Sequence, residues 1–237
     1  MPNESLEAKV EAMEKELSRL KDIDAIRRVE HAYNWYLVQW MPDEIVDLFA
    51  DRKDISARFP EGRFVGKKSV DHFYRFVNPN HNPEIMHQMM HMSDIIDISE
   101  DGKTGKGRWW GFGAIAIPKR GTSEIVAAMV CGIYENDFIK ENDIWKLWHL
   151  DWTPLYYFLP EVGWVDKERL AEPGPPLPLP EGGVGVAEGL NPDEPAKEIW
   201  YSYPSGYIMP FHFKHPVTGK ETNERKLNKR VKNIENE

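Results

Sequence analysis

The sequence predicts an α+β protein in which helices pack on one face of a curved sheet. Apolar residues recur at helical spacing in roughly the first 50 residues, and runs rich in Ile, Val and aromatic residues dominate residues 86–157. Turn signals such as Asp101-Gly102 separate these runs, as between antiparallel strands. Helices first and a meander of long strands afterwards are typical of the α+β class.

The first predicted helix, over residues 5–30, carries a coiled-coil-like pattern. Its apolar residues recur at spacings of 4, 3, 4 and 3, at Leu6, Val10, Met13, Leu17 and Leu20. Two interpretations stay open: an amphipathic helix lying on its own domain, or an intermolecular helical arm. Two heptads are too short to pair without support from a folded domain.

The remaining elements follow from periodicity and turn residues. Further helices are expected over Ile26–Trp40, Asp43–Phe49 and Lys68–Phe76. Strands are expected over Ile55–Phe59, Arg63–Val65, Met86–Ser99, Gly105–Pro118, Ser123–Lys140 and Ile144–Tyr157.

The last third of the chain has a different composition. Residues 172–197 hold seven prolines and five glycines, too many for a packed core. Aromatic residues return from Ile199 to Phe213, so we expect this segment to dock on its own domain or a neighbour. The organisation expected is a helical arm (residues 1–24), an α+β domain (15–160) and a Pro-rich, aromatic C-terminal extension (161–237).

Composition narrows the function classes. Asp+Glu 39 against Lys+Arg 30 give a net charge of −9, which argues against a nucleic-acid partner. The single cysteine, the lack of a long apolar stretch and an acidic N-terminus predict a cytoplasmic protein with no membrane segment. The 9 Trp, 9 Tyr and 10 Phe suit the walls of a pocket for a hydrophobic small molecule.

Motif absences direct attention to acid–base chemistry without a cofactor. The sequence contains no G-x-G-x-x-G, no Walker loop and no G-x-S-x-G elbow. The run His87-Gln-Met-Met-His91 would put its two histidines on one face of a helix. On a strand the two histidines are roughly 13 Å apart, too far to bind one metal ion. We therefore expect no metal and no cofactor.

Two groups of residues are candidates for proton transfer. His149 and Asp151 are two apart on a strand, hence on one face, which alternation makes the face of Trp145 and Leu147. They form either a proton shuttle or a solvent-facing pair. Tyr33 and Tyr36 share a helix face with Trp40 one turn on, either as core aromatics or with a hydroxyl directed into a cavity.

A series of motifs over roughly residues 15–220 resembles SnoaL-like proteins of the nuclear-transport-factor-2-like superfamily, which includes scytalone dehydratase. The end of the chain resembles a long-chain subgroup with a C-terminal extension. The motifs are Ile26–Tyr36, Asp43–Ala50, Phe64–Lys67, His87, Asp101–Trp109, Tyr134–Asn136, Trp145–Lys146, Gly163–Trp164 and Pro210–Gly219.

The resemblance implies a cone-shaped, curved mixed sheet wrapped around helices. In dehydratase-like members a helix Tyr, an Asp five residues later and a strand His line the pocket. Tyr33 and His87 match, whereas Val38 stands at the position of the Asp. One hypothesis is that Asp151, paired with His149, supplies the carboxylate that Val38 lacks.

The function expected is a cofactor-independent lyase, a dehydratase or a retro-aldol enzyme, acting on a hydrophobic hydroxylated aromatic or polycyclic compound. The expected catalytic residues are Tyr33, His87, His149 and Asp151, and the expected substrate contacts are Tyr36, Trp40, Met90 and Trp109. The alternative is a non-catalytic binding or accessory protein. A homodimer or homotrimer is expected.

Overall fold

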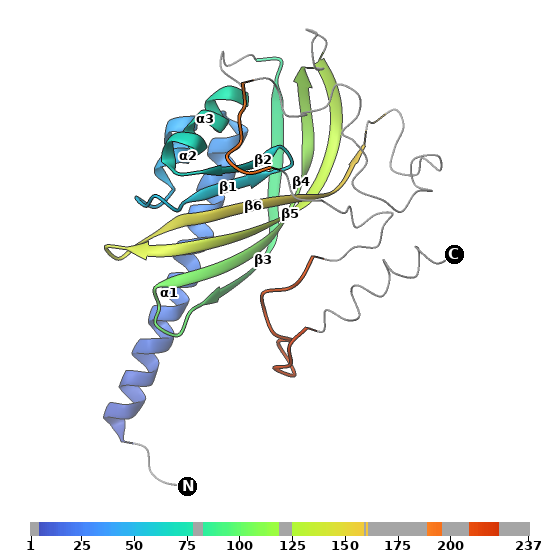
Figure 1. Cartoon of the computed structure of the whole chain (residues 1–237). Helices are drawn as coiled ribbons and strands as arrows, with labels where there is room; N and C mark the ends of the chain where they lie inside the picture. The colour runs from blue at the N-terminus through green and yellow to red at the C-terminus, as the bar shows by residue number, and fades with distance from the viewer. Residues whose placement is uncertain are drawn as a thin grey trace.

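The computed structural model describes residues 5–77, 83–118, 125–158, 160, 189–195 and 209–222. Its helices are α1 (Leu6–Val38), α2 (Pro42–Asp47) and α3 (Lys67–Val77). Its strands are β1 (Ser56–Phe59), β2 (Gly62–Val65), β3 (Met86–Ile98), β4 (Thr104–Pro118), β5 (Ile125–Glu141) and β6 (Ile144–Phe158). The strands form a curved, unclosed sheet with the helices on one face, which confirms the predicted α+β architecture (Figure 1).

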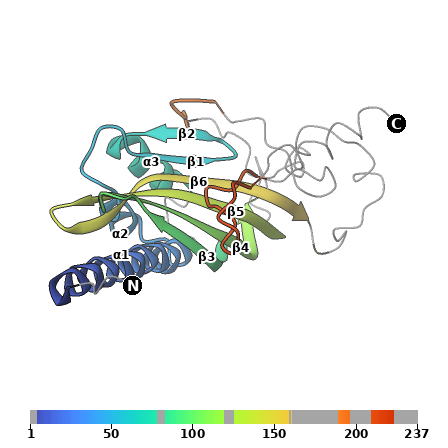
Figure 2. The same ribbon diagram turned by 90° about the horizontal axis from the view of Figure 1, so that it is seen from below.

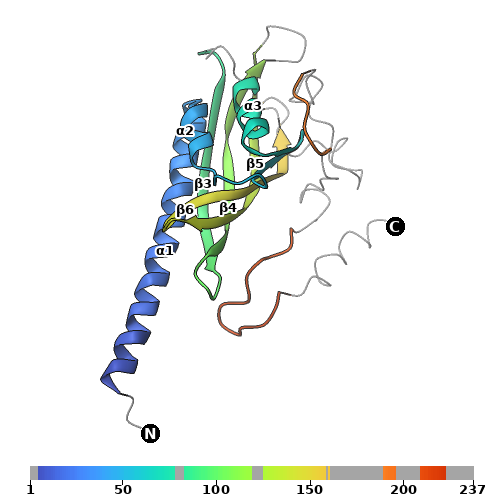
Figure 3. The same cartoon turned by 60° about the vertical axis from the view of Figure 1, so that its left-hand side comes forward.

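One continuous helix replaces the two that the sequence predicts at the N-terminus. α1 runs for 33 residues, because no glycine or proline interrupts it and Ser5 caps its first turn by accepting from the Ala8 N–H at 3.2 Å. Its C-terminal half packs along β3 (Figure 2), and its N-terminal half continues beyond the sheet (Figure 3). Within the described ranges, none of the helices combines the length and apolarity needed to span a bilayer.

The sheet is mixed, with strand order β2-β1-β6-β5-β4-β3. The neighbours β1 and β6 are parallel, and the other neighbours are antiparallel. The turn between β5 and β6 consists of Asn142 and Asp143, both with positive φ (51° and 62°), as a tight two-residue hairpin requires.

Irregularities in the strand pairing bend the sheet and change which side chains face the helices. In the β5–β6 pair, Asp137 lies opposite His149 but its neighbour Phe138 lies opposite Leu147, so Trp148 is an extra residue on β6. Such a bulge reverses the alternation of side chains beyond it.

The hydrophobic core lies between the helices and the concave face of the sheet. It draws large buried side chains from α1, β2, β4, β5 and β6, among them Ile26, Tyr33, Phe64, Trp109, Phe138 and Leu147. The Trp109 ring covers Gly107, where a Cβ would lie 2.1 Å from that ring. This glycine therefore makes room for the largest core side chain.

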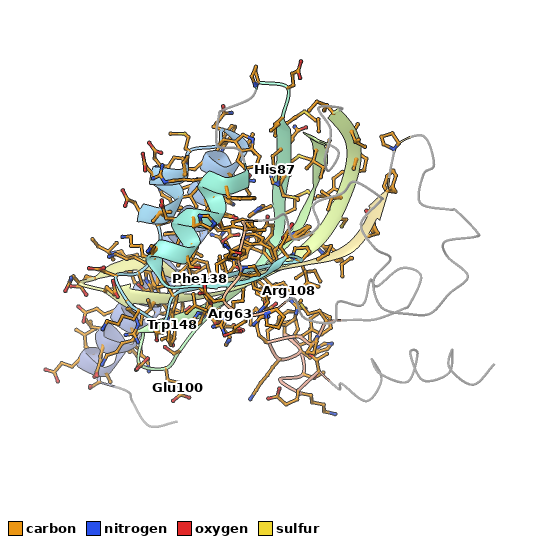
Figure 4. The ribbon with its side chains drawn as sticks, turned by 45° about the horizontal axis from the view of Figure 1, so that its top comes forward. Arg63, His87, Glu100, Arg108, Phe138 and Trp148 are labelled. Carbon is orange, nitrogen blue, oxygen red and sulfur yellow. The ribbon has the colours of Figure 1, made fainter. Side chains whose placement is uncertain are left out.

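Two described segments of the C-terminal extension contact the domain. Residues 189–195 lie beside β2, where the Arg63 N–H donates to the Glu194 carbonyl at 2.9 Å. Residues 209–222 lie beside Arg108, whose guanidinium donates to the Pro210 carbonyl and lies 4.8 Å from the centre of the Phe211 ring (Figure 4). The described part of the aromatic segment thus docks on the chain's own domain, and residues 199–208 lie outside the described residues.

Candidate active site

A carboxylate lies in the middle of the buried stripe of α1. Glu30 is 0% exposed and shares this stripe with Ile26, Tyr33 and Leu37. Carboxylates are rarely fully buried unless hydrogen-bond donors surround them. The position of Glu30 therefore indicates a polar site inside the core.

Two side chains from the sheet bind the two oxygens of Glu30. His91, on β3, places its Nδ1 at 2.7 Å from Oε1, and Asn136, on β5, donates from Nδ2 to Oε2 at 2.9 Å. The side chains of Glu30 and His91 are both fully buried. A hydrogen bond between two buried, charge-capable groups is strong because water does not compete for it.

This arrangement determines how the His91 ring can act. When Glu30 is ionised it only accepts, so Nδ1 of His91 carries a proton, and in the neutral ring Nε2 then carries a lone pair. Among the residues described, His91 Nε2 has no hydrogen-bond partner although it is buried. An unpartnered, carboxylate-oriented imidazole nitrogen is what a general base requires.

Asn136 holds Glu30 in place through a second hydrogen bond. Its Oδ1 accepts from the backbone N–H of Asp151 at 3.1 Å, which orients the amide so that Nδ2 points at Glu30. The amide thereby links β6, β5 and α1 around the carboxylate.

Two tyrosines pack against the His91 ring, and a third is hydrogen-bonded to one of them. Tyr33 lies 5.8 Å and Tyr134 4.0 Å from it between ring centres, and the hydroxyl of Tyr74 donates to that of Tyr33 at 3.1 Å. Burial raises the pKa of all three phenols above the ordinary value, and the charge of Glu30 adds to the effect, whereas the hydrogen bond with Tyr33 opposes it in Tyr74 and Tyr134. The three tyrosines therefore stay protonated at neutral pH and can act as hydrogen-bond donors.

His87 faces the same side of β3 as His91 but occupies an apolar position. It packs edge-on against Trp40 at 5.5 Å between ring centres, and its buried Nδ1 has no partner among the described residues. Burial lowers the pKa of His87 to about 4. Figure 4 shows it toward the upper end of β3.

The structure places His149 and Asp151 on the opposite face of the sheet. Leu147 and Leu150 are both core residues, at 0% and 1% exposure, which strict alternation would not allow. The bulge at Trp148 reverses the facing, so the expectation that His149 and Asp151 share the face of Leu147 is wrong.

On that opposite face, other residues of the domain bind both side chains. The Nδ1 of His149 lies 3.0 Å from Ser56 Oγ, and its ring stacks on the neighbouring Trp148. Asp151 pairs with Arg58 at 3.5 Å, and Arg58 also pairs with Glu194 at 3.3 Å. The structure therefore does not bring either residue together with Tyr33 or His87.

The four expected substrate contacts divide in the same way. Trp40 and Trp109 are buried at 9% and 1% exposure, and Tyr36 packs partly buried against the core. Met90 is 43% exposed because it alternates with the buried Met89, so it lies on the face of β3 away from the other three.

Sequence reasoning missed Glu30, His91 and Asn136. A signal for Glu30 exists, because it occupies an apolar stripe at spacings of 4, 3 and 4 with Ile26, Tyr33 and Leu37. The strand interpretation of residues 87–91 also puts His91 on the face of His87. In the described part of the chain, no cluster of three or more His, Cys, Asp or Glu could hold a metal ion.

The SnoaL-like domain family matches residues 18–151, more than half of the chain and all of the residues of this cluster. The chain belongs to the SnoaL-like family. A search of curated protein sequences gives no match.

Solved structures are also similar to this SnoaL-like chain. One is a protein from Novosphingobium aromaticivorans assigned as a scytalone dehydratase, with 17% identity over 60% of this chain and 89% of that one, and a TM-score of 0.50. Another is the hexachlorocyclohexane dehydrochlorinase LinA-type3 from Novosphingobium barchaimii, with 12% identity over 61% and 93% of the two chains and a TM-score of 0.47.

Proposed function

We propose that this protein is a cofactor-independent lyase whose acid–base centre is the buried Glu30–His91 pair. One observation carries the proposal: His91 presents a buried, unpartnered Nε2 while Glu30 holds its Nδ1 at 2.7 Å. A buried polar atom without a partner in a native fold calls for an explanation, and a substrate group is one that fits here.

In the proposed reaction, Nε2 of His91 removes a proton from a carbon or hydroxyl of the substrate. The ring then carries a positive charge, which the carboxylate of Glu30 stabilises from the other side. Asn136 keeps that carboxylate in line with the ring, so it acts as a positioning residue.

The tyrosine chain supplies the proton for the leaving group. Tyr74 is hydrogen-bonded to Tyr33, and Tyr134 lies within hydrogen-bonding reach of Tyr33. The three hydroxyl groups carry three protons, and the two hydrogen bonds between them use two. One proton is therefore left to donate to the substrate. It passes to the departing oxygen as the C–O bond breaks and a C=C bond forms, which releases water from the substrate.

The same groups also suit a retro-aldol step. There His91 removes the proton of a hydroxyl, a C–C bond breaks, a small aldehyde leaves, and the carbanion is reprotonated. In either reaction one general base and one general acid each contribute about 10² to 10⁴ in rate, enough for an activated substrate.

The substrate class follows from the surroundings of the pair. The groups around Glu30 and His91 are aromatic, with Trp152 at 6.2 Å from Tyr134 between ring centres. A flat, hydrophobic compound with a hydroxyl group would stack on these rings and offer its oxygen to a tyrosine.

Mass spectrometry of the protein with a panel of hydroxylated aromatic and polycyclic compounds tests the proposal. We expect a product lighter by one water or one small aldehyde, formed by the unmodified protein and by His149→Gln but not by His91→Gln. Binding of compounds with no change in mass, and with the same affinity in His91→Gln, would instead support a non-catalytic binding protein.

A further inference from the structure

The N-terminal half of α1 carries an apolar stripe that none of the described residues covers. Its residues are 46–77% exposed: Leu6, Val10, Met13, Leu17 and Leu20. This half of the helix extends beyond the sheet (Figures 1 and 3). The stripe therefore does not pack on the described part of its own domain.

The direction of the stripe follows from helix geometry. At 100° per residue, its centre lies roughly 150° around the helix from the buried stripe that includes Ile26 and Leu37. The same helix thus presents one apolar face to its own core and a second one, nearly opposite, to solvent. A continuous apolar stripe of this kind marks an interaction surface.

The stripe has heptad order, which identifies the kind of partner. Val10 and Leu17 occupy a positions, and Leu6, Met13 and Leu20 occupy d positions. A β-branched or leucine residue at a with leucine or methionine at d is the pattern of a two-stranded coiled coil. The partner must be another helix with the same spacing.

The charged residues that flank the seam favour a second copy in parallel orientation. In a parallel pair each g residue faces the e residue of the next heptad in the other chain. Lys9 then faces Glu14 of the second copy, and Glu16 faces Lys21 of the second copy. Both contacts join opposite charges, and two-fold symmetry repeats each of them.

An antiparallel pair is less complementary. The register that aligns Val10 with Leu20 and Met13 with Leu17 places Glu7 of each copy beside Lys21 of the other, but it also brings two copies of Glu14 together, and likewise two copies of Glu16. Like charges in contact oppose pairing.

We propose that the N-terminal half of α1 forms a parallel, in-register, two-stranded coiled coil with a second copy of this chain. The seam ends at Asp24, the next a position, because two aspartates facing each other would separate the helices there. Just beyond it, Arg27 pairs with Asp94 of β3 at 2.9 Å, where the helix joins its own domain.

Anchoring in the domain explains how so short a coiled coil can form. Nucleating a helix is the costly step, and the buried C-terminal half of α1 already provides the nucleus. Association then requires the docking of two preformed helices and little ordering of the chain.

Three sets of variants test the coiled coil by sedimentation and by cross-linking at tens of micromolar protein. Val10→Asp/Leu17→Asp should convert the dimer to a monomer, because it raises the dissociation constant on the order of 100-fold or more. Lys9→Glu should weaken the dimer, and Lys9→Glu/Glu14→Lys should restore it. Restoration is specific to the parallel orientation.

Cross-linking tests the register. Met13→Cys should form a disulfide-linked dimer under mild oxidation, whereas Ala12→Cys, one residue away from the seam, should not. The buried Cys131 is present in both variants. Circular dichroism confirms that each variant keeps its fold.

The proposal would be overturned if the unmodified protein were monomeric, or if the Val10→Asp/Leu17→Asp variant stayed dimeric. It would also be overturned if the charge swap did not restore the dimer, or if Met13→Cys and Ala12→Cys cross-linked equally.

Discussion

The two faces of the sheet each hold a histidine and a carboxylate, but their surroundings differ. On the helix-facing side, Glu30 and His91 are fully buried and bind each other. On the opposite side, Asp151 pairs with the guanidinium of Arg58, and the His149 ring binds Ser56. Among the described residues, the buried Nε2 of His91 has no hydrogen-bond partner, whereas in the second pair a cation already engages the carboxylate.

In the proposed function, this difference separates the reactive pair from the structural one. A carboxylate can stabilise a charged imidazole only when no cation already neutralises it. Burial strengthens such a pair because water does not screen it. Residue types and spacing along the strand therefore matter less than the face to which a side chain points.

The largest expected effect is a difference in kcat/KM between variants of His91 and His149. His91→Gln should lower kcat/KM about 10² to 10⁴-fold because it removes the proposed base. The matched variant His149→Gln should change it by less than about threefold, since its ring lies on the other face. Steady-state kinetics on any compound converted in the panel measures both, and the reverse order of effects would contradict the assignment.

Glu61 gives a second way to sharpen the comparison, because it is buried like Glu30 but lacks its donors. It is 6% exposed, and within the described residues its carboxyl receives a hydrogen bond from its own backbone N–H and from no side chain. Burial raises the pKa of Glu61 to about 7. The unfolded state ionises at lower pH than the folded state, so this group costs stability as pH rises from about 4.5 to about 7.

Glu61→Gln should therefore raise the free energy of unfolding by up to about 3 kcal/mol above about pH 7. The difference should vanish near pH 4.5, measured by denaturant titration of both proteins in parallel at several pH values. A constant difference at all pH values would show that the carboxyl is not buried in its neutral form.

His87 should show the opposite dependence on pH. Its pKa, lowered to about 4 by burial, means that the unfolded state takes up a proton first as the pH falls below about 6.5. The free energy of unfolding should fall by up to about 3 kcal/mol between about pH 6.5 and pH 4. In His87→Gln this fall should be smaller, so the free energy of unfolding should depend less on pH. His149, which is half-buried, serves as the control: His149→Gln should flatten the profile less.

The smallest expected effect concerns the ion pair on the opposite face. Asp151→Asn should cost about 1 kcal/mol or less of stability, because the pair with Arg58 is partly exposed. It should also leave turnover within about twofold, since the substitution keeps the backbone N–H that Asn136 accepts and changes the side chain that pairs with Arg58. A loss of turnover comparable to that of His91→Gln would return Asp151 to the catalytic role first expected from the sequence.

Much of the fold could be predicted from the sequence because its signals are local. Helical spacing, turn residues and apolar runs place the helices and strands within a few residues of their positions. The continuity of α1 was missed, although no helix-breaking residue separates its two halves.

The candidate site could be predicted only in part, for reasons that particular residues make clear. The prediction from side-chain alternation is wrong on β6 because of the bulge at Trp148. That bulge depends on pairing with β5, which the local sequence does not reveal. The family resemblance places a carboxylate five residues after Tyr33, where this chain has Val38. The buried carboxylate of the structure is instead Glu30, three residues before Tyr33. Asn136 joins Glu30 only through tertiary contact, so no local pattern identifies it.

The most direct test of the Glu30–His91 centre is the tautomer of His91, measured by proton–nitrogen NMR correlation of the histidine rings near neutral pH. The signal is assigned by its loss in His91→Gln. The account predicts a proton on Nδ1, held by Glu30, and an unprotonated Nε2, with this preference lost in Glu30→Gln. A proton on Nε2 of His91 in the unmodified protein would contradict it.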